Sequence, residues 1–207
     1  MDIILENVGR RFNREWIFKD INYHFHTGKS YAILGINGSG KSTLLHILSG
    51  SLAPSSGKIS FIDAEKSTSI DIEKVFAHIA IAAPYLELIE DFTLTEAIDF
   101  HFKFKKPLNN ICQDDVIKLL GMQNNKNKQI KYYSSGMKQR VKLALAVLSE
   151  TTVLFLDEPC SNLDQQGIEW YQQLITDYTR GRLLIVCSNQ EVEYNFCENQ
   201  LKIADYK

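Results

Sequence analysis

The sequence has 207 residues, of which 44% are hydrophobic and 23% are charged, and this is the size and composition of one soluble globular domain. The formal net charge of −2 argues against general nucleic-acid binding, because proteins that bind nucleic acids carry a basic surface. No stretch approaches the roughly 18 apolar residues of a membrane-spanning helix, and the acidic start of the chain does not resemble a signal peptide. We therefore expect any role at a membrane to require a separate membrane subunit.

The first 84 residues are rich in predicted strands, because short apolar or alternating runs are separated by turn residues. The expected strands are Asp2 to Val8, Ile17 to Phe25, Tyr31 to Leu34, Lys58 to Ile62 and Ile79 to Ala83. A polar loop is expected over Gly9 to Arg14. His24 and His26 share one face of a predicted strand, which fits either half of a metal site or an ordinary solvated face. We favour the solvated face.

One segment of this region carries recognisable chemistry. Gly35 to Thr43, GINGSGKST, has the spacing of a phosphate-binding loop, with Gly, four residues, Gly, Lys and Ser. It lies between a predicted strand and a run of helical spacing, Leu44 to Leu48, as such a loop should. Its glycines allow successive backbone N–H groups to converge on one anion at the start of the helix. The expected phosphate contacts are Gly35, Ile36, Asn37, Gly38, Ser39, Gly40, Lys41, Ser42 and Thr43, with the Ser42 hydroxyl as a magnesium ligand.

From Tyr85 to about Glu150 the strand signals give way to helical ones. Thr93 is expected to cap a helix over Thr95 to Lys105, because Glu96 completes the pattern of a capping box. Further helices are predicted over Asp114 to Leu120 and after Ser134-Ser135-Gly136.

The last third of the chain alternates between strands and helices again. The predicted elements are a strand at Thr152 to Leu156, a helix at Gln165 to Thr179, a strand at Leu183 to Cys187, a short helix at Glu191 to Cys197 and a strand at Leu201 to Ala204. Apolar strands that alternate with helices indicate a parallel sheet covered on both faces, which binds ligands at the carboxyl ends of its strands. The phosphate-binding loop, Asp157 and Ser188 all lie at such ends.

A second motif, Val153 to Pro159, reads VLFLDEP and ends a buried strand with two acids. A carboxylate in this position beside a phosphate-binding loop suits magnesium, so we assign Asp157 as a metal ligand. Glu158 is expected to act as the general base that polarises the attacking water.

A third motif is Tyr133 to Arg140, which contains Ser134, Ser135 and Gly136. With the first two motifs, in this order, it resembles the ATP-binding cassette (ABC) family, the nucleotide-binding subunits of ABC transporters. The resemblance implies that Ser134, Ser135 and Gly136 contact the ATP of an opposite subunit, although Ser135 stands where a Gly is usual. It also implies that Phe12 stacks on adenine, with Trp16 as the alternative and a core role for Phe12 as the competing interpretation.

The resemblance implies an α/β fold: a P-loop NTPase core with a mostly parallel sheet, an N-terminal antiparallel β region and an inserted helical subdomain. We expect residues 1–207 to form a single ABC ATPase domain, with an α/β core of 1–84 and 151–207 and a helical subdomain of about 85–150.

Two departures from the family pattern concern the γ-phosphate. The family's Gln after the strand Ile79 to Ala83 is expected at Ala83 or Pro84, and neither side chain can coordinate. Asn189 replaces the usual catalytic His; it can hydrogen-bond a phosphate oxygen but carries neither a charge nor a labile proton.

The leading interpretation is the ATP-hydrolysing subunit of an ABC transporter, with ATP and Mg²⁺ as cofactors. The resemblance implies a cytoplasmic protein at the inner face of the membrane, a transmembrane permease partner and a homodimer or heterodimer of cassettes. The alternative is a weakly hydrolysing, regulatory half of a heterodimer. A role in repair or translation is disfavoured, because neither a coiled-coil insert nor a second cassette is present. We expect Tyr85 to Ile89, with one face of the helix that carries Phe100, Phe102 and Phe104, to receive the membrane partner, unless both faces pack inside.

Overall fold

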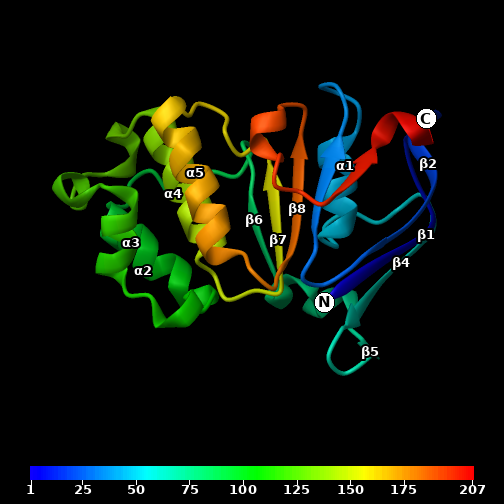
Figure 1. Cartoon of the computed structure of the whole chain (residues 1–207), viewed down its shortest axis with the longest axis horizontal. Coiled ribbons are helices and arrows are strands. Elements are labelled where there is room, and N and C mark those ends of the chain that lie inside the picture. The colour runs from blue at the N-terminus through cyan, green and yellow to red at the C-terminus, as the bar shows by residue number, and fades with distance from the viewer.

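The computed structural model describes residues 1–207, and its centre is a five-stranded parallel sheet in the order β6-β7-β8-β3-β9. Its strands are β3 (Ser30–Leu34), β6 (Ile79–Ala82), β7 (Val153–Asp157), β8 (Leu183–Ser188) and β9 (Asn199–Lys202). Because all pairs are parallel, the carboxyl ends of the strands meet at one edge, which is the upper edge in Figure 1. The expected parallel sheet is confirmed.

A second, antiparallel sheet of order β2-β1-β4-β5 lies to one side of the parallel sheet (Figure 1). Its strands are β1 (Asp2–Phe12), β2 (Glu15–Phe25), β4 (Ser56–Asp63) and β5 (Thr68–Ser69). The loop predicted over Gly9 to Arg14 is wrong, because β1 continues to Phe12 and only Asn13 and Arg14 form the turn. Both faces of this hairpin end are largely exposed, so it carries charged residues as well as the aromatic Phe12 and Trp16, although it pairs as strands.

Alternate residues of the central strands face two separate hydrophobic clusters. Leu154 and Leu156 of β7 pack on one face with the helices α3, α4 and α5. Val153 and Phe155 pack on the other face with α1 and the antiparallel sheet. All four side chains are fully buried, which explains why β7 is apolar throughout. The parallel sheet therefore lies between two hydrophobic layers, and its carboxyl-terminal edge is positioned by both.

The α-helices are α1 (Lys41–Leu48), α2 (Leu94–Phe104), α3 (Gln113–Leu120), α4 (Ser135–Val147) and α5 (Gln165–Tyr178). The predicted capping box of α2 is confirmed: the Glu96 N–H donates to Thr93 Oγ1 at 3.3 Å, and the Thr93 N–H donates to the Glu96 carboxylate at 2.7 Å. Helices α2, α3 and α4 form the left-hand part of the molecule in Figure 1, beside α5. The division into a core and a helical subdomain remains our interpretation of this arrangement.

Short 3-10 turns occupy several connections, at Ile72–His78, Leu108–Asn110, Gln123–Asn125, Ile130–Tyr132, Glu191–Glu193 and Ile203–Tyr206. The predicted helix from Glu191 to Cys197 is therefore wrong beyond its first turn. The last strand also begins earlier than predicted, because β9 takes its register from β3, with Leu201 opposite Ile33. None of the helices has the length and apolar character needed to span a membrane.

Candidate nucleotide-binding site

The loop that begins at Gly35 joins the upper end of β3 to α1. Gly38 and Gly40 adopt positive φ angles of 77° and 111°, which side chains disfavour. A Cβ at Gly40 would also collide with the Ile17 side chain. Gly35 differs from the expectation, because its φ is not positive. A Cβ there would lie 2.3 Å from the Ser39 hydroxyl, so a larger residue would force that hydroxyl to move. The loop conformation thus depends most on Gly38 and Gly40.

Lys41 is the first residue of α1 and is only 5% exposed. Its Nζ donates hydrogen bonds to the carbonyl oxygens of Gly35 at 2.8 Å and Ile36 at 3.3 Å. The cation is therefore folded over the loop and satisfied by neutral acceptors. Because charge-assisted hydrogen bonds are about twice as strong as neutral ones, phosphate oxygens are better partners for this group.

Asp157 ends β7 with a nearly buried carboxylate, and its Oδ1 has no hydrogen-bond partner. Burial raises the pKa of Asp157, while the neighbouring Ser42 hydroxyl and the Lys41 cation oppose that rise. A buried carboxylate oxygen without a partner is costly unless it coordinates a cation. Oxygen donors from a carboxylate and a hydroxyl are those that Mg²⁺ prefers. The donor set of Asp157 and Ser42 therefore fits Mg²⁺.

Glu158 follows with a left-handed backbone, φ 43°, and its N–H donates to the Cys187 carbonyl at 2.9 Å. Such a conformation in a non-glycine residue is sparsely populated and is held only by its surroundings. Glu158 lines a cavity of about 340 Å³, whose other walls are Ile17, Asn37, Gly38, Gly40, Lys41, Ser42 and Thr43. The structure therefore brings the predicted general base and the phosphate-binding loop to one cavity.

Asn189 follows the end of β8 and lies against the same loop. Its Nδ2 donates to Asn37 Oδ1 at 3.2 Å. The amide therefore reaches the loop, as a group that contacts a phosphate must, and it is exposed. Ile36, at the outer side of the loop, is 80% exposed.

Glu193, which the sequence did not point to, is fully buried. Its carboxylate accepts hydrogen bonds from the Cys160 N–H at 2.7 Å and from the Ser188 hydroxyl. It therefore braces the segment that follows Glu158 against the end of β8, next to Asn189. No local pattern marks this residue, because an isolated acid in a polar segment usually lies at the surface.

Tyr85, which was expected only as part of the surface for the membrane partner, lies directly after Ala83 and Pro84, which offer no polar side chain. Its ring centre is 5.1 Å from that of His46 on α1. Burial and the negative charge of Asp157 raise the pKa of Tyr85 to about 12. A phenol hydroxyl therefore lies near Asp157, in the region where the sequence analysis expected a side chain to be lacking.

Ser134, Ser135 and Gly136 do not line the cavity of their own phosphate-binding loop. Ser134 caps α4, and its Oγ accepts from the Met137 N–H at 3.2 Å. Both serines are exposed. A Cβ on Gly136 would lie 2.8 Å from the Asn162 carbonyl oxygen, so the start of α4 packs tightly on the segment after β7. The helix terminus is thus open to a ligand from outside this chain's cavity.

Phe12 lies at the hairpin end and is 48% exposed, so its interpretation as a core aromatic is wrong. The Arg10 guanidinium lies 4.7 Å from its ring centre, and the Arg11 guanidinium 5.6 Å from that of Trp16. Neither ring lines the phosphate-loop cavity, whereas Ile17 does.

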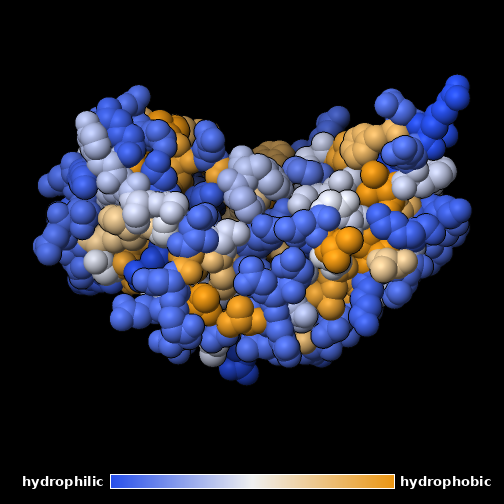
Figure 2. Space-filling model, turned by 90° about the horizontal axis from the view of Figure 1, so that it is seen from above, coloured by the Kyte–Doolittle hydropathy of each residue, from blue (hydrophilic) through white to orange (hydrophobic).

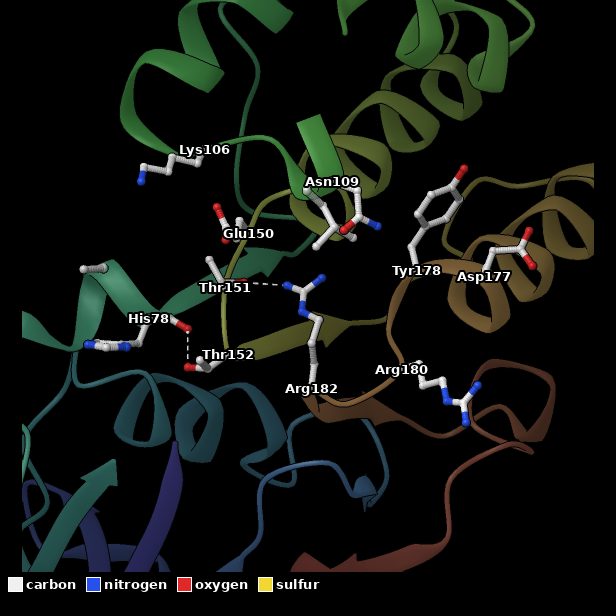
Figure 3. Close-up of a pocket in the computed structure, with 12 residues that line it drawn as sticks. His78, Lys106, Asn109, Glu150, Thr151, Thr152, Asp177, Tyr178, Arg180 and Arg182 are labelled. Carbon is white, nitrogen blue, oxygen red and sulfur yellow. Dashed lines mark hydrogen bonds between the residues drawn. The ribbon is translucent and has the colours of Figure 1, made fainter. Parts of the chain in front are cut away.

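Polar surface lies at both ends of the parallel strands. Seen from above, onto the carboxyl ends, the surface is mostly hydrophilic with small apolar patches (Figure 2). Near the amino-terminal end of β7, a polar cavity of about 560 Å³ is lined by residues including Glu150, Thr151 and Arg182 (Figure 3). The buried Arg182 donates to the Val147 carbonyl at 2.6 Å and to the Thr151 hydroxyl, which fastens the end of α4 to the sheet.

Comparison with known proteins gives consistent results. The family model described as "ABC transporter" matches residues 18–161. The lantibiotic transport ATP-binding protein SrtF of Streptococcus pyogenes is 30% identical, over 92% of this chain and 82% of its own length. The uncharacterized ABC transporter ATP-binding protein YybJ of Bacillus subtilis is 26% identical, over 95% of this chain and 90% of its own length.

Solved structures show the same fold. A putative ABC transporter ATP-binding protein from Pyrococcus furiosus superposes with a TM-score of 0.81 at 20% identity, with both chains covered completely. A bacterial ABC transporter cassette, solved as a dimer, superposes with a TM-score of 0.77 at 22% identity over 97% of this chain and 94% of its own. The expected P-loop NTPase fold is confirmed. Because the family model spans both the phosphate-binding loop and the acids after β7, the chain belongs to the ABC transporter family, as an ATP-binding cassette.

Proposed function

We propose that this chain is the ATP-hydrolysing subunit of an ABC transporter, acting at the cytoplasmic face of the membrane with a separate permease. The observation that carries the proposal is the shared cavity of Lys41, Ser42 and Glu158, with the unpaired Asp157 oxygen beside it. A phosphate-binding loop by itself supports only the binding of an anion. The acids at the end of β7 add the groups that hydrolysis needs.

The chemistry of each residue determines the role that we assign to it. The loop N–H groups and Lys41 bind the phosphates. Ser42 and Asp157 would hold Mg²⁺, which neutralises charge on the phosphates. Glu158 accepts a proton from the attacking water, and Asn189 donates a neutral hydrogen bond to a phosphate oxygen.

The exposed start of α4 supports a two-subunit site. Two copies, or this chain and a second cassette, would associate head to tail, so that Ser134, Ser135 and Gly136 of one face the ATP on the loop of the other. The two serines are exposed, Gly136 is partly exposed, and all three lie outside their own cavity, as such a contact requires. Phe12, also exposed, would stack on the adenine ring.

Turnover of ATP with the co-expressed permease tests the proposal. Lys41→Ala should abolish ATP binding, because it removes the cation that faces the phosphates. Glu158→Gln should keep ATP binding and lower kcat by roughly 10²- to 10⁴-fold, as expected for loss of a general base. Glu169→Gln, on the exposed side of α5, is the matched control and should leave both unchanged. Equal turnover in wild type and both site variants would overturn the assignment.

A second candidate function, a regulatory cassette with little hydrolysis, is favoured by one observation. The group that reaches the loop from the end of β8 is the neutral amide of Asn189. If this amide limits hydrolysis, Asn189→His should raise kcat at least about tenfold, since a charge-assisted hydrogen bond replaces a neutral one. Asn189→Asp offers similar size with the wrong charge and should not. An unchanged kcat in the His variant would count against Asn189 as the limiting group.

A further inference from the structure

Three side chains that the nucleotide site does not use converge on the antiparallel sheet. His24 Nε2 lies 3.0 Å from Asp2 Oδ2, and His26 Nδ1 lies 3.4 Å from the same oxygen. The two imidazole rings are tilted by 37° to each other, with centres 3.7 Å apart. Asp2 begins β1, His24 lies near the end of β2 and His26 directly follows that strand. The start of β1 lies at the point labelled N in Figure 1. Three potential metal ligands therefore point to one place.

The strand pairing explains this convergence. Ile4 of β1 lies opposite His24 of β2, and Ile3 lies opposite Phe25. Because side chains alternate between faces, Asp2 and the two histidines share the outer face, while Ile3 and Phe25 are buried. A His-x-His pair on one strand thus meets a carboxylate on its neighbour.

The carboxylate of Asp2 is held in place from its other side. Its Oδ1 accepts hydrogen bonds from the Thr27 N–H at 2.8 Å and the Thr27 hydroxyl at 2.7 Å, so Oδ2 is turned toward the imidazoles. The hydrogen bonds from Thr27 therefore fix the orientation of the carboxylate, as hydrogen-bonded neighbours do for the ligands of metal sites.

The spacing fits a tetrahedral ion. Ligands bound at about 2.0–2.1 Å in a tetrahedron lie roughly 3.3 Å apart. The two separations from Asp2 Oδ2, 3.0 and 3.4 Å, bracket this value, and the ligand atoms of all three residues lie within 4.8 Å of one another. We propose that Asp2, His24 and His26 form a binding site for a divalent transition metal, with Zn²⁺ as the best match for two imidazoles and one carboxylate.

This site is separate from the nucleotide site. None of the three residues lines the phosphate-loop cavity. Asp2 also lies at the end of β1 opposite to Phe12, and an 11-residue strand is on the order of 30 Å long. Because the metal joins β1 to the end of β2 only in the folded protein, binding also raises the Tm. Zn²⁺ and Mg²⁺ effects can therefore be measured independently.

The test is Zn²⁺ titration of the metal-stripped full chain without nucleotide, followed by calorimetry and by the visible absorption of bound Co²⁺. All proteins carry Cys112→Ser, because Cys112 is an exposed thiol that could bind metal by itself. We expect one equivalent of Zn²⁺ to bind. His24→Gln with His26→Gln should abolish it, and Thr27→Val, which removes only the hydroxyl that orients Asp2, should weaken it roughly tenfold. His78→Gln is the matched control and should bind as the parent does.

The Tm measured in EDTA distinguishes loss of metal binding from loss of folding. Since both histidines are exposed, the double variant should retain the parent Tm in EDTA and lose only the Zn²⁺-dependent increase. Absence of stoichiometric Zn²⁺ binding to the parent, or equal affinity in the double variant, would overturn the proposal. Asp2→Asn keeps the Thr27 hydrogen bonds but removes the anionic oxygen, so equal affinity in this variant would also contradict it.

Discussion

Glu193 is a buried acid that links two segments of the nucleotide-binding site. Its carboxylate is fully buried without a cationic partner, and it accepts hydrogen bonds from the Cys160 N–H and the Ser188 hydroxyl. Burial raises its pKa above the ordinary value of 4.5, although the hydrogen bonds oppose the shift. The folded state therefore binds the proton more tightly than the unfolded state. As pH rises from 4.5 toward the folded-state pKa, the folded protein loses stability through this group.

We predict that Glu193→Gln removes this pH dependence. The free energy of unfolding of wild type minus that of the variant should fall as pH rises above 4.5, because only wild type carries the buried acid. Urea unfolding across that range measures the difference. Glu193→Leu leaves the Cys160 N–H unpaired and should cost roughly 1–3 kcal/mol more than the Gln variant. A difference between wild type and Glu193→Gln that does not change with pH would contradict the role assigned to Glu193.

Among the elements, those with local signals were predictable. The capping pair Thr93 and Glu96 fixed the start of α2, and Gly121 ended α3 with a φ of 67°. The phosphate-binding loop was recognisable because all its contacts are contiguous in sequence and their spacing is dictated by the loop itself. Asp157 was recognisable because a parallel strand ends there beside that loop.

Elements and residues that depend on distant partners were not predictable. The outer half of β1 is polar and is a strand only because β2 pairs with it, with Arg11 opposite Trp16. The position of β9 is set by β3. Likewise, Glu193 becomes part of the site only when β8 lies beside β7, and Asp2 meets His24 only when β1 pairs with β2. In each case the informative neighbour is far away in sequence.

At the scale of the whole molecule, one face of α2 remains without a partner. The opposite face lies inside the protein, because Ile98 is buried and Phe102 packs against the core. This agrees with the expectation that only one face of the helix is free to receive a partner. Phe100 and Phe104 are 40% and 74% exposed and meet edge to face with ring centres 5.1 Å apart. They border a groove of about 190 Å³ whose lining also includes Leu88, Ile89 and Phe92. We propose that this aromatic groove receives a cytoplasmic helix of the permease.

The structure also selects the variants that test this docking. Leu88 packs against the core and Tyr85 lies near Asp157, so changing either would disturb more than the surface. Ile89 and Phe104 are exposed and lie outside the phosphate-loop cavity. Combined Ile89→Glu and Phe104→Glu should therefore reduce co-purification with the permease at least about tenfold, because a charge buried in an apolar contact without a partner is costly.

The same double variant should bind ATP with unchanged affinity and retain its Tm. Ile72→Glu adds a charge at another exposed apolar residue, 50% exposed and outside the groove, and should leave co-purification intact. This control separates loss of a specific contact from a general effect of added charge. If the double variant still co-purifies fully with the permease, the aromatic groove is not the docking surface, while the ATPase assignment, which rests on Lys41 and Glu158, is unaffected.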